Sequence, residues 1–294
     1  MKKIGSNLHL QLARMKTVSV YGSTGFIGNS YCDLYKSQVS KIPRDERKPN
    51  NKDILYLIST VHNYNIFNEP LLDVNTNLNI LIKTLESCRK KYNSNFVFNF
   101  ISSWFVYGKT EDLPASEDSN CNPKGFYSIT KRAAEQMLVS YCETHNINYR
   151  ILRLGNIYGT NDVKASKKKN AFLYLAEQVA QGRDIQLCNE GKNIRDFLHV
   201  SDVCSAINLV INKGKLNQIY NIGSGKPNTF IETMSYVRTK SQSNSRFEFI
   251  DPPEFHKVVQ VQDMYLNTSK LKELGFEQKI SIWKGLDEII ENSK

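Results

Sequence analysis

The sequence feature that most constrains this chain is a run of spaced glycines near its start. Residues 22–28 read GSTGFIG, a G-x-x-G-x-x-G pattern. Residues 17–21 predict a short strand before the run, and residues 26–38 predict a helix after it. Glycines allow a tight turn there, and they let backbone amides at the positive end of the helix approach a pyrophosphate. A purely structural turn is the alternative. We interpret the run as a dinucleotide-binding turn made by Gly22, Ser23, Thr24, Gly25, Phe26, Ile27 and Gly28.

The rest of the first half alternates between predicted strands and predicted helices. Strands are expected at residues 39–43, 53–60, 95–103 and 148–159, the last ending in a turn, and helices at residues 71–90 and 128–145. Such alternation is typical of an α/β fold with a doubly wound parallel (Rossmann) sheet and helices on both faces. The interval between Val39 and Asp53 has space for one strand and a loop, so we expect the sheet to be one unit short.

The pattern becomes less regular after about residue 160, with loops, a helix near residues 172–181 and a final helical segment. We expect a dinucleotide-binding domain over residues 1–160, in which residues 1–15 are an extra N-terminal segment. Residues 161–294 are expected to form a smaller, mainly substrate-binding lobe, from which about 195–225 return to the first domain. A chain of about 300 residues commonly divides in this way.

Composition excludes several classes of protein. The 294 residues contain no apolar run near the roughly 20 residues of a membrane span, and the first residues do not resemble a secretory signal, so we expect a cytoplasmic protein with no membrane partner. The six cysteines are scattered with no C-x-x-C, which favours free thiols and no metal site. The net charge of +10 suggests an acidic partner. The basic clusters at 44–48 and 167–169 are short and lack interleaved aromatic residues, so we interpret them as solvated loop charge and expect no nucleic-acid partner.

The end of the second predicted strand bears on the choice of cofactor. In a dinucleotide-binding domain, a residue about 20 positions beyond the glycine turn meets the adenine ribose. An acidic residue there favours the free 2′-hydroxyl of NAD, whereas arginine accommodates the 2′-phosphate of NADP. Arg44 comes first after the strand, with Asp45 and Glu46 beside it. We therefore expect NADP with a contact from Arg44, and NAD is the alternative.

A Tyr–Lys pair at helical spacing provides candidate catalytic groups. Tyr127 and Lys131 are four residues apart and share one helix face, where an ammonium group can lower the pKa of a phenol. Tyr236 and Lys240 have the same spacing. Tyr127 follows Ser103 by 24 residues, and Ser103 ends a predicted strand at the same sheet edge. Because Tyr236 has no such companion, we assign Tyr127 and Lys131 to the site and interpret Tyr236 as structural.

The glycine turn, Ser103, Tyr127 and Lys131 together resemble the extended short-chain dehydrogenase/reductase family in its nucleotide-sugar branch. The resemblance runs from about residue 17 to the end. Residues 101–108 (ISSWFVYG) look like the family's catalytic Ser/Thr segment, with Ser103 at the catalytic position. Residues 53–60 (DILYLIST) are similar to its fourth strand, which implies that Ile58, Ser59 and Thr60 border the cofactor.

Two later segments extend the resemblance to the substrate. Residues 153–159 (RLGNIYG) resemble the family's R-x-x-N-x-Y-G segment, which implies that Asn156 contacts the nucleotide end of the substrate. Residues 191–202 (GKNIRDFLHVSD) resemble its G-x-x-x-R-D-F/Y-x-H-V-x-D segment, which implies that Arg195 faces the diphosphate, although an Arg paired with Asp196 or Asp202 is the structural alternative. The resemblance thus implies a nucleotide-diphosphate sugar as substrate and a homodimer built on paired helices.

The departures from the family pattern narrow the reaction. Dehydratases and decarboxylases of this family carry an acid/base after the catalytic Ser/Thr, where this chain has Trp104 and Phe105. Reductases that also epimerise carry a Cys at the position of Phe105. His62 lies near the cofactor strand, and we interpret it as a loop residue.

What remains is hydride chemistry at one carbinol or ketone carbon. Tyr127 would exchange the proton with the sugar oxygen, Ser103 would hydrogen-bond that oxygen, and Lys131 would support the phenolate and bind the nicotinamide ribose. We expect an NADPH-dependent reductase of a 4-keto-6-deoxy nucleotide sugar. The alternatives are an NAD-retaining 4-epimerase and, more remotely, a non-catalytic dinucleotide-binding regulator.

Overall fold

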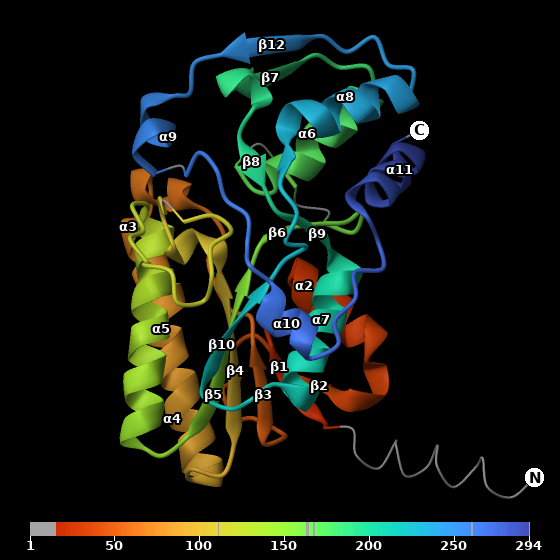
Figure 1. Ribbon diagram of the computed structural model, residues 1–294. Helices are drawn as coiled ribbons and strands as arrows, with labels where there is room; N and C mark the ends of the chain where they lie inside the picture. The colour runs from red at the N-terminus through yellow and green to blue at the C-terminus, as the bar shows by residue number, and fades with distance from the viewer. Residues whose placement is uncertain (1–15, 111, 163–164, 167, 260, 294) are drawn as a thin grey trace, which may run out of the picture.

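The core of the protein is a parallel sheet of six strands in the order β10-β5-β4-β3-β1-β2 (Figure 1). The computed structural model describes residues 16–110, 112–162, 165–166, 168–259 and 261–293. The sheet strands are β1 (Val18–Tyr21), β2 (Val39–Lys41), β3 (Asp53–Tyr56), β4 (Val97–Ser103), β5 (Asn148–Leu154) and β10 (Gln218–Ile222). The α/β fold with a doubly wound parallel sheet is therefore confirmed.

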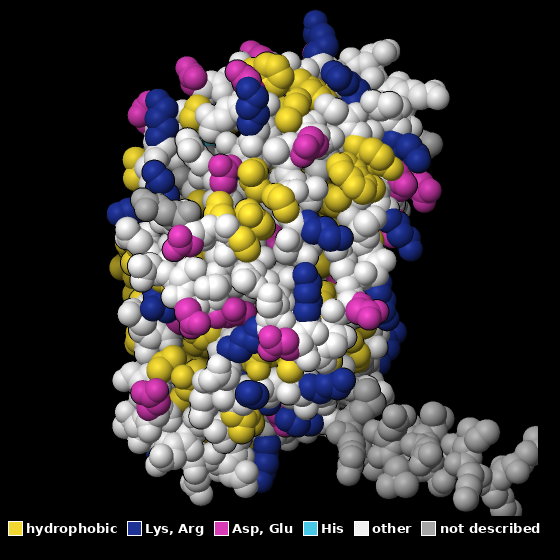
Figure 2. All heavy atoms as spheres, in the orientation of Figure 1, with side chains coloured by type: hydrophobic (Ala, Val, Ile, Leu, Met, Phe, Trp, Pro, Cys, Tyr) yellow, Lys and Arg dark blue, Asp and Glu magenta, His cyan; other side chains and the backbone are white. Residues whose placement is uncertain are grey.

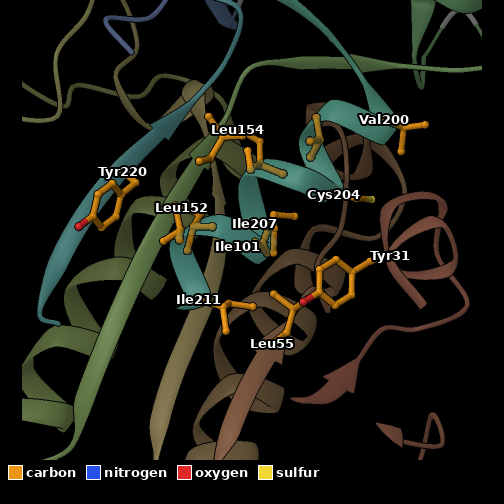
Figure 3. Close-up of a cluster of buried hydrophobic side chains, with 14 of the residues drawn as sticks. Tyr31, Leu55, Ile101, Leu152, Leu154, Val200, Cys204, Ile207, Ile211 and Tyr220 are labelled. Atoms are coloured by element: carbon orange, nitrogen blue, oxygen red, sulfur yellow. The ribbon is translucent and has the colours of Figure 1, made fainter. Parts of the chain in front are cut away.

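Helices cover both faces of this sheet. Helices α2 (Phe26–Leu34) and α7 (Val200–Lys213) pack on one face, and α4 (Ile80–Tyr92) and α5 (Phe126–Thr144) pack on the other. Because side chains alternate along a strand, Leu55 of β3 joins one core while Ile54 and Tyr56 join the other. Figure 3 shows the core beneath α7, made by Tyr31, Leu55, Ile101, Leu152, Leu154, Val200, Cys204, Ile207, Ile211 and Tyr220.

The sheet ends at β2, as the short interval in the sequence predicts. No helix separates β2 from β3, and the connecting loop folds back over β1 instead. The backbone amides of Asn50 and Asn51 donate to Ser19 Oγ at 2.9 and 2.7 Å, and the Tyr21 hydroxyl donates to the Arg47 carbonyl at 2.6 Å. These side-chain bonds hold the loop against β1, and β2 is left as the edge strand of the sheet.

Several predicted elements have different bounds in the structure. The first helix ends at Leu34 and is followed by a 3-10 turn at Lys36–Gln38. The strand predicted over 53–60 ends at Tyr56, because Ser59 Oγ and the Thr60 amide both bond to Asn77 Oδ1 at 3.0 Å rather than to a strand. Long-range side-chain bonds of this kind leave no periodic signal in a sequence.

Two other predicted elements are divided. The helix predicted over 71–90 comprises α3 (Pro70–Val74), a π-helical turn (Asn75–Asn79) and α4. The strand predicted over 148–159 becomes β5 and β6 (Asn156–Tyr158), and β6 pairs with β9 (Phe197–His199) outside the main sheet. The chain changes sheet at Gly155, whose amide bonds to the Ile222 carbonyl, whereas the next amide bonds to Asp196.

A second, smaller group of elements lies over the carboxyl ends of the sheet strands (Figure 1). It has its own core, which includes Phe172, Phe197 and Leu286. Its elements are α6 (Ala171–Ala180), β7 (Ile185–Cys188), β8 (Ile194–Arg195), β11 (Asn228–Thr229), α8 (Phe230–Lys240), β12 (Phe247–Ile250), α9 (Glu254–Val259) and α11 (Ile282–Asn292), whereas α10 (Ser269–Glu273) packs beside β10. Between β9 and β11 the chain contributes α7 and β10 to the large sheet layer.

The expected N-terminal segment, residues 1–15, lies outside the described residues. Among the described helices, none has the length and apolar character to cross a membrane.

A buried ion pair fastens α5 to the sheet. Arg153 of β5 donates to Glu135 of α5 through Nε at 3.0 Å and Nη2 at 2.9 Å, and both side chains are 1% exposed. Arg132 adds a third bond to the same carboxylate at 2.9 Å. Two parallel charge-assisted bonds fix both the distance and the rotation of α5 relative to β5.

We expect Glu135→Gln to lower the free energy of unfolding by about 3 kcal/mol, because the Arg153 charge then remains buried without a counter-charge. Urea denaturation measures this loss. Glu143→Gln on the exposed surface of the same helix is the matched control and should change stability by less than about 0.5 kcal/mol. Equal effects of the two substitutions would show that the pair does not hold the helix.

Candidate active site

A cleft of about 870 Å³ separates the carboxyl edge of the sheet from the second lobe. It brings together side chains from β3, β4, α2, α5 and the second lobe. Among its lining residues are these members of the predicted site: Gly22, Gly25, Phe26, Ile27, Gly28, Ser59, Thr60, Ser103, Tyr127, Lys131, Asn156 and Arg195. The cleft is thus the candidate active site.

The glycine turn forms one end of this cleft. Gly22 has a φ of +79°, which favours glycine, and a Cβ on Gly28 would lie 2.2 Å from the Gly22 carbonyl oxygen. The N-terminus of α2 therefore sits directly against the turn. Its N-cap residue, Gly25, has no side chain to occupy the free amides, so they remain open to an anion. The turn fits the pyrophosphate of a dinucleotide; Ser23 is buried within it and Thr24 is exposed.

The catalytic candidates meet at the middle of the cleft. Tyr127 and Lys131 lie on the first two turns of α5 and are 7% and 2% exposed. Burial raises the pKa of Tyr127 to about 12, and the Ser103 and Ser59 hydroxyls beside it oppose that rise. Ser103 ends β4 and accepts a bond from the Phe105 amide at 3.3 Å. The phenol is therefore protonated at neutral pH and lies beside a second hydroxyl.

Lys131 is held by groups other than the phenol. Its Nζ donates to the Ile101 carbonyl at 2.7 Å and lies 4.2 Å from the centroid of the Phe100 ring. Burial lowers the pKa of Lys131 to about 7, against the opposing charge of Glu135 one turn further along α5. The ammonium has one protein acceptor on the cleft wall, which leaves N–H donors for a ligand such as a ribose hydroxyl.

Asn77 is a site residue that the sequence analysis missed. It lies buried in the π-helical turn, and its Nδ2 donates to Thr60 Oγ1 and Thr130 Oγ1 at 2.9 Å. Since it also binds Ser59, it ties the end of β3 to the first turn of α5 and places Ser59 beside Tyr127. The sequence did contain a sign of this role. Asn77 lies four residues before Leu81, on the apolar face of the predicted helix, where a buried polar side chain needs hydrogen-bond partners.

Arg195 is buried in the wall of the cleft, and among the described residues no carboxylate accepts a hydrogen bond from it. Its guanidinium donates to the carbonyls of Ile194, Gln262 and Val261, and burial lowers its pKa to about 10. The structural alternative, an Arg paired with Asp196 or Asp202, is wrong. Those carboxylates instead accept backbone and hydroxyl donors, which come from Ser224, Gly225, Leu266, Lys279 and Ile280.

The lysine cluster near residue 168 contributes to the lining of the cleft, which the sequence analysis did not predict. Lys168 is an exposed loop residue, as expected, and Lys169 is partly buried. Lys168 Nζ lies 5.4 Å from the Tyr64 ring centroid, and Lys169 pairs with Asp162 at 3.1 Å. Lys167 lies outside the described residues. The described lining contains four cationic side chains (Lys131, Lys168, Lys169 and Arg195) and one carboxylate (Asp162). By contrast, basic and acidic side chains are interspersed over the face in Figure 2. The described lining of the cleft is therefore more uniformly positive than the face seen in Figure 2.

The loop after β3 and helix α9 meet at the mouth of the cleft. The Tyr64 hydroxyl bonds to His256 Nε2, and the rings of Tyr64 and Phe255 are 5.2 Å apart. His62 is a loop residue, as predicted, and its ring packs edge-on against Tyr64 and lines the cleft. These side chains connect the two lobes.

Four predicted cofactor contacts do not line the cleft: Ser23 and Thr24 of the glycine turn, Ile58 and Arg44. Ile58 packs into the core beneath α4 and α5. Arg44 is exposed beyond β2, where its carbonyl accepts a bond from Arg47 at 2.7 Å. In the same loop Glu46 Oε1 accepts the amides of Arg47 and Lys48 at 2.7 and 2.6 Å. Among the described residues, no three His, Cys, Asp or Glu side chains converge as metal ligands.

The pKa of Lys131 predicts a stability trend with pH. Between about pH 7 and 10 the unfolded chain holds a proton on this lysine that the folded chain releases, so stability from this group rises with pH. We expect the free energy of unfolding of the wild type, relative to Lys131→Met, to increase by about 2 kcal/mol from pH 7 to pH 9. Urea denaturation at each pH measures it, and the exposed Lys90→Met is the control. A constant difference would contradict the prediction.

Comparison with known proteins places these observations in a family. Residues 54–223, more than half of the chain, match the family model of the NAD dependent epimerase/dehydratase family. A low-salt glycan biosynthesis protein of Haloferax volcanii is 30% identical over 65% of this chain and 59% of its own length. A trifunctional UDP-glucose 4,6-dehydratase/3,5-epimerase/reductase of Arabidopsis thaliana is 26% identical over 81% of this chain and 35% of its own length. The chain thus spans less than two thirds of either relative.

Solved structures share the fold over nearly the whole chain. UDP-glucose 4-epimerase of Thermotoga maritima, solved with UDP-glucose, has a TM-score of 0.84 and 22% identity over 94% of this chain and 97% of its own. RMD of Pseudomonas aeruginosa, solved with NADPH, has a TM-score of 0.83 and 20% identity over 95% of this chain and 98% of its own. The resemblance drawn from the sequence is confirmed: the chain belongs to the NAD dependent epimerase/dehydratase family, whose members are NAD(P)-dependent nucleotide-sugar enzymes.

Proposed function

We propose that this protein reduces the 4-keto group of a 4-keto-6-deoxy nucleotide sugar with NADPH. The observation that carries the proposal is the composition of the reacting centre. Ser103 and Tyr127 lie together, and the next two residues after Ser103 are the aromatic Trp104 and Phe105. Neither aromatic side chain transfers protons, so a dehydration with a second acid/base at this position is not supported.

The side chains divide the reduction between them. When bound, the reduced nicotinamide supplies the hydride to C4 of the sugar. The Tyr127 hydroxyl, protonated because its pKa is about 12, gives its proton to O4, and solvent returns a proton to the phenolate. Ser103 donates a second hydrogen bond to O4. Lys131 holds the nicotinamide ribose through its free N–H donors.

The positive side chains of the cleft support a diphosphate substrate. Among the described residues, Arg195 hydrogen-bonds only to carbonyls, and the Asp263 carboxylate opposes only part of the effect of burial on its pKa. A diphosphate would add charge-assisted bonds to this guanidinium. Lys168 and Lys169 extend the positive charge, and Asn156 lies on the same lining beside the Asp196 carbonyl. We assign these residues to the nucleotide diphosphate.

The loop after β2 supports NADP over NAD. Glu46 already accepts two backbone amides of its own loop, which leaves Arg44 and Asp45 as the exposed charges at the strand end. A guanidinium there fits a 2′-phosphate. The shortened sheet also offers the adenine few partners, which suits a cofactor that is released after each turnover.

A 4-epimerase that retains NAD is the second candidate. Its chemistry uses the same Ser103, Tyr127 and Lys131. Asp45 follows Arg44 beyond β2, and an acidic residue in that region favours the free 2′-hydroxyl of NAD. The fold of this chain is also that of the Thermotoga maritima UDP-glucose 4-epimerase.

We also propose a homodimer formed through the outer face of α5. Ile129 and Met137 are 45% and 38% exposed on this helix, and Leu72 of the neighbouring α3 is 38% exposed. Three exposed apolar side chains on two neighbouring helices favour pairing with a second copy. Light scattering of the purified protein gives its mass and tests this point.

The stoichiometry of the cofactor decides between reductase and epimerase. We expect NADPH absorbance to fall in proportion to the ketone reduced when a 4-keto-6-deoxy nucleotide sugar is supplied. Interconversion of two 4-hydroxy sugars with no net consumption of cofactor would establish the epimerase instead.

Tyr127→Phe should lower kcat by about 10²- to 10⁴-fold while cofactor affinity and thermal stability stay close to wild type, because the substitution removes one proton donor and little packing. Tyr236→Phe is the matched control, since the Tyr236 hydroxyl bonds to Asp287 in the second lobe, at 2.8 Å. Loss of activity in the control variant alone would refute the assignment of the catalytic tyrosine.

Arg195→Ala should raise the KM for the sugar nucleotide about tenfold to hundredfold and change the Kd of the dinucleotide much less. Steady-state kinetics and cofactor titration measure the two effects. Arg238→Ala removes an arginine that stacks on Phe247 in the same lobe and serves as the control. Equal weakening of both ligands, with a lower Tm, would assign Arg195 a structural role.

A further inference from the structure

Two aromatic rings connect the cationic wall of the cleft to the reacting pair. The Arg195 guanidinium lies 5.3 Å from the centroid of the Trp104 ring, which stacks on Phe105 at 4.1 Å. The Phe105 ring in turn meets the Tyr127 ring edge-on at 5.9 Å. Because all four side chains line the cleft, they form a continuous path from the diphosphate position to the position of the reacting oxygen.

We propose that this aromatic wall, Trp104 and Phe105, selects sugars whose C6 is a methyl group. The inference rests on the proposed function, in which Arg195 binds the diphosphate on the C1 side and Tyr127 meets the oxygen on C4. The sugar ring then spans the space between them along the wall. Since Phe105 contacts the Tyr127 ring, it faces the substituent next to C4.

The chemistry of the lining decides which substituent that is. Phe105 has no donor or acceptor, so a hydroxyl group placed against it would lose its hydrogen-bond partners. The C3 hydroxyl therefore fits elsewhere, and the loop after β3 and α9 offer His62, Tyr64 and His256 on the same lining. The apolar edge of C5 with a methyl C6 is the group that fits Phe105.

The wall is also rigid. Trp104 is 4% exposed and packs into a core with Tyr107 and Leu266. The 3-10 turn Trp104–Val106 begins at Ser103, whose Oγ accepts the Phe105 amide. The position of Phe105 relative to the Ser103 hydroxyl is thus fixed by this turn. A sugar that hydrogen-bonds to Ser103 through O4 therefore meets Phe105 at a defined place.

Equilibrium binding tests the proposal without turnover. Calorimetry on the protein saturated with NADP⁺ compares the Kd of 6-deoxyglucose and glucose linked to the same nucleoside diphosphate, in a UDP and a dTDP series. We expect the 6-deoxy compound to bind about tenfold tighter or more. Phe105→Tyr places a hydroxyl on the wall and should reduce this ratio severalfold, whereas the apolar control Phe105→Leu should keep it.

Equal affinities in the wild type, no binding of either compound in both series, or a ratio unchanged in Phe105→Tyr would overturn the inference. Its failure differs from that of the proposed function. A 6-deoxy preference without NADPH consumption refutes the reductase alone, and NADPH consumption with equal affinities refutes the aromatic selection alone. If Phe105→Tyr fails to fold, as thermal unfolding will show, the wild-type ratio and the Phe105→Leu variant still decide the outcome.

Discussion

The arrangement of the active site depends on the buried ion pair between Arg153 and Glu135. Glu135 lies one helical turn beyond Lys131, so the two bonds that lock α5 onto β5 also set the height of Lys131 and Tyr127 above the sheet. The two side chains are each 1% exposed, so separating these buried charges would cost much free energy. The pair therefore holds α5 in one position on the sheet. Asn77 also helps to fix α5, because it donates neutral hydrogen bonds to Thr130 of this helix and to Thr60 of the loop after β3.

Burial governs the charge of the site as well as its geometry. The fold removes Tyr127, Lys131 and Arg195 from water, which raises the pKa of the phenol and lowers the pKa of both cations. Only Arg195 remains firmly charged at neutral pH among these three, and its described partners are carbonyls. An anionic ligand therefore gains from entering the cleft, and the phenol keeps the proton that a reduction consumes.

Much of this could be predicted from the sequence because the signals are local. The glycine turn, the alternation of strands and helices and the four-residue spacing of Tyr127 and Lys131 each lie within one segment. The absence of a further strand beyond β2 could be predicted from the short interval between residues 39 and 53. The prediction failed where partners are distant in sequence: β3 ends early because Asn77 replaces its strand partner. The sequence also did not show that the loop of Lys168 lies along the cleft.

The sequence by itself determined the fold class and the position of the glycine turn, and most of the site residues that it predicted line the candidate site. These depend on backbone conformation and side-chain periodicity, which act over a few residues. Only the tertiary structure decided the partners of those residues. Arg195 bonds to carbonyls rather than to Asp196 or Asp202, and Trp104 and Phe105 join it to Tyr127. Such contacts join segments that are distant in the sequence and that only the folded chain brings together, because burial and hydrogen bonding depend on proximity in space.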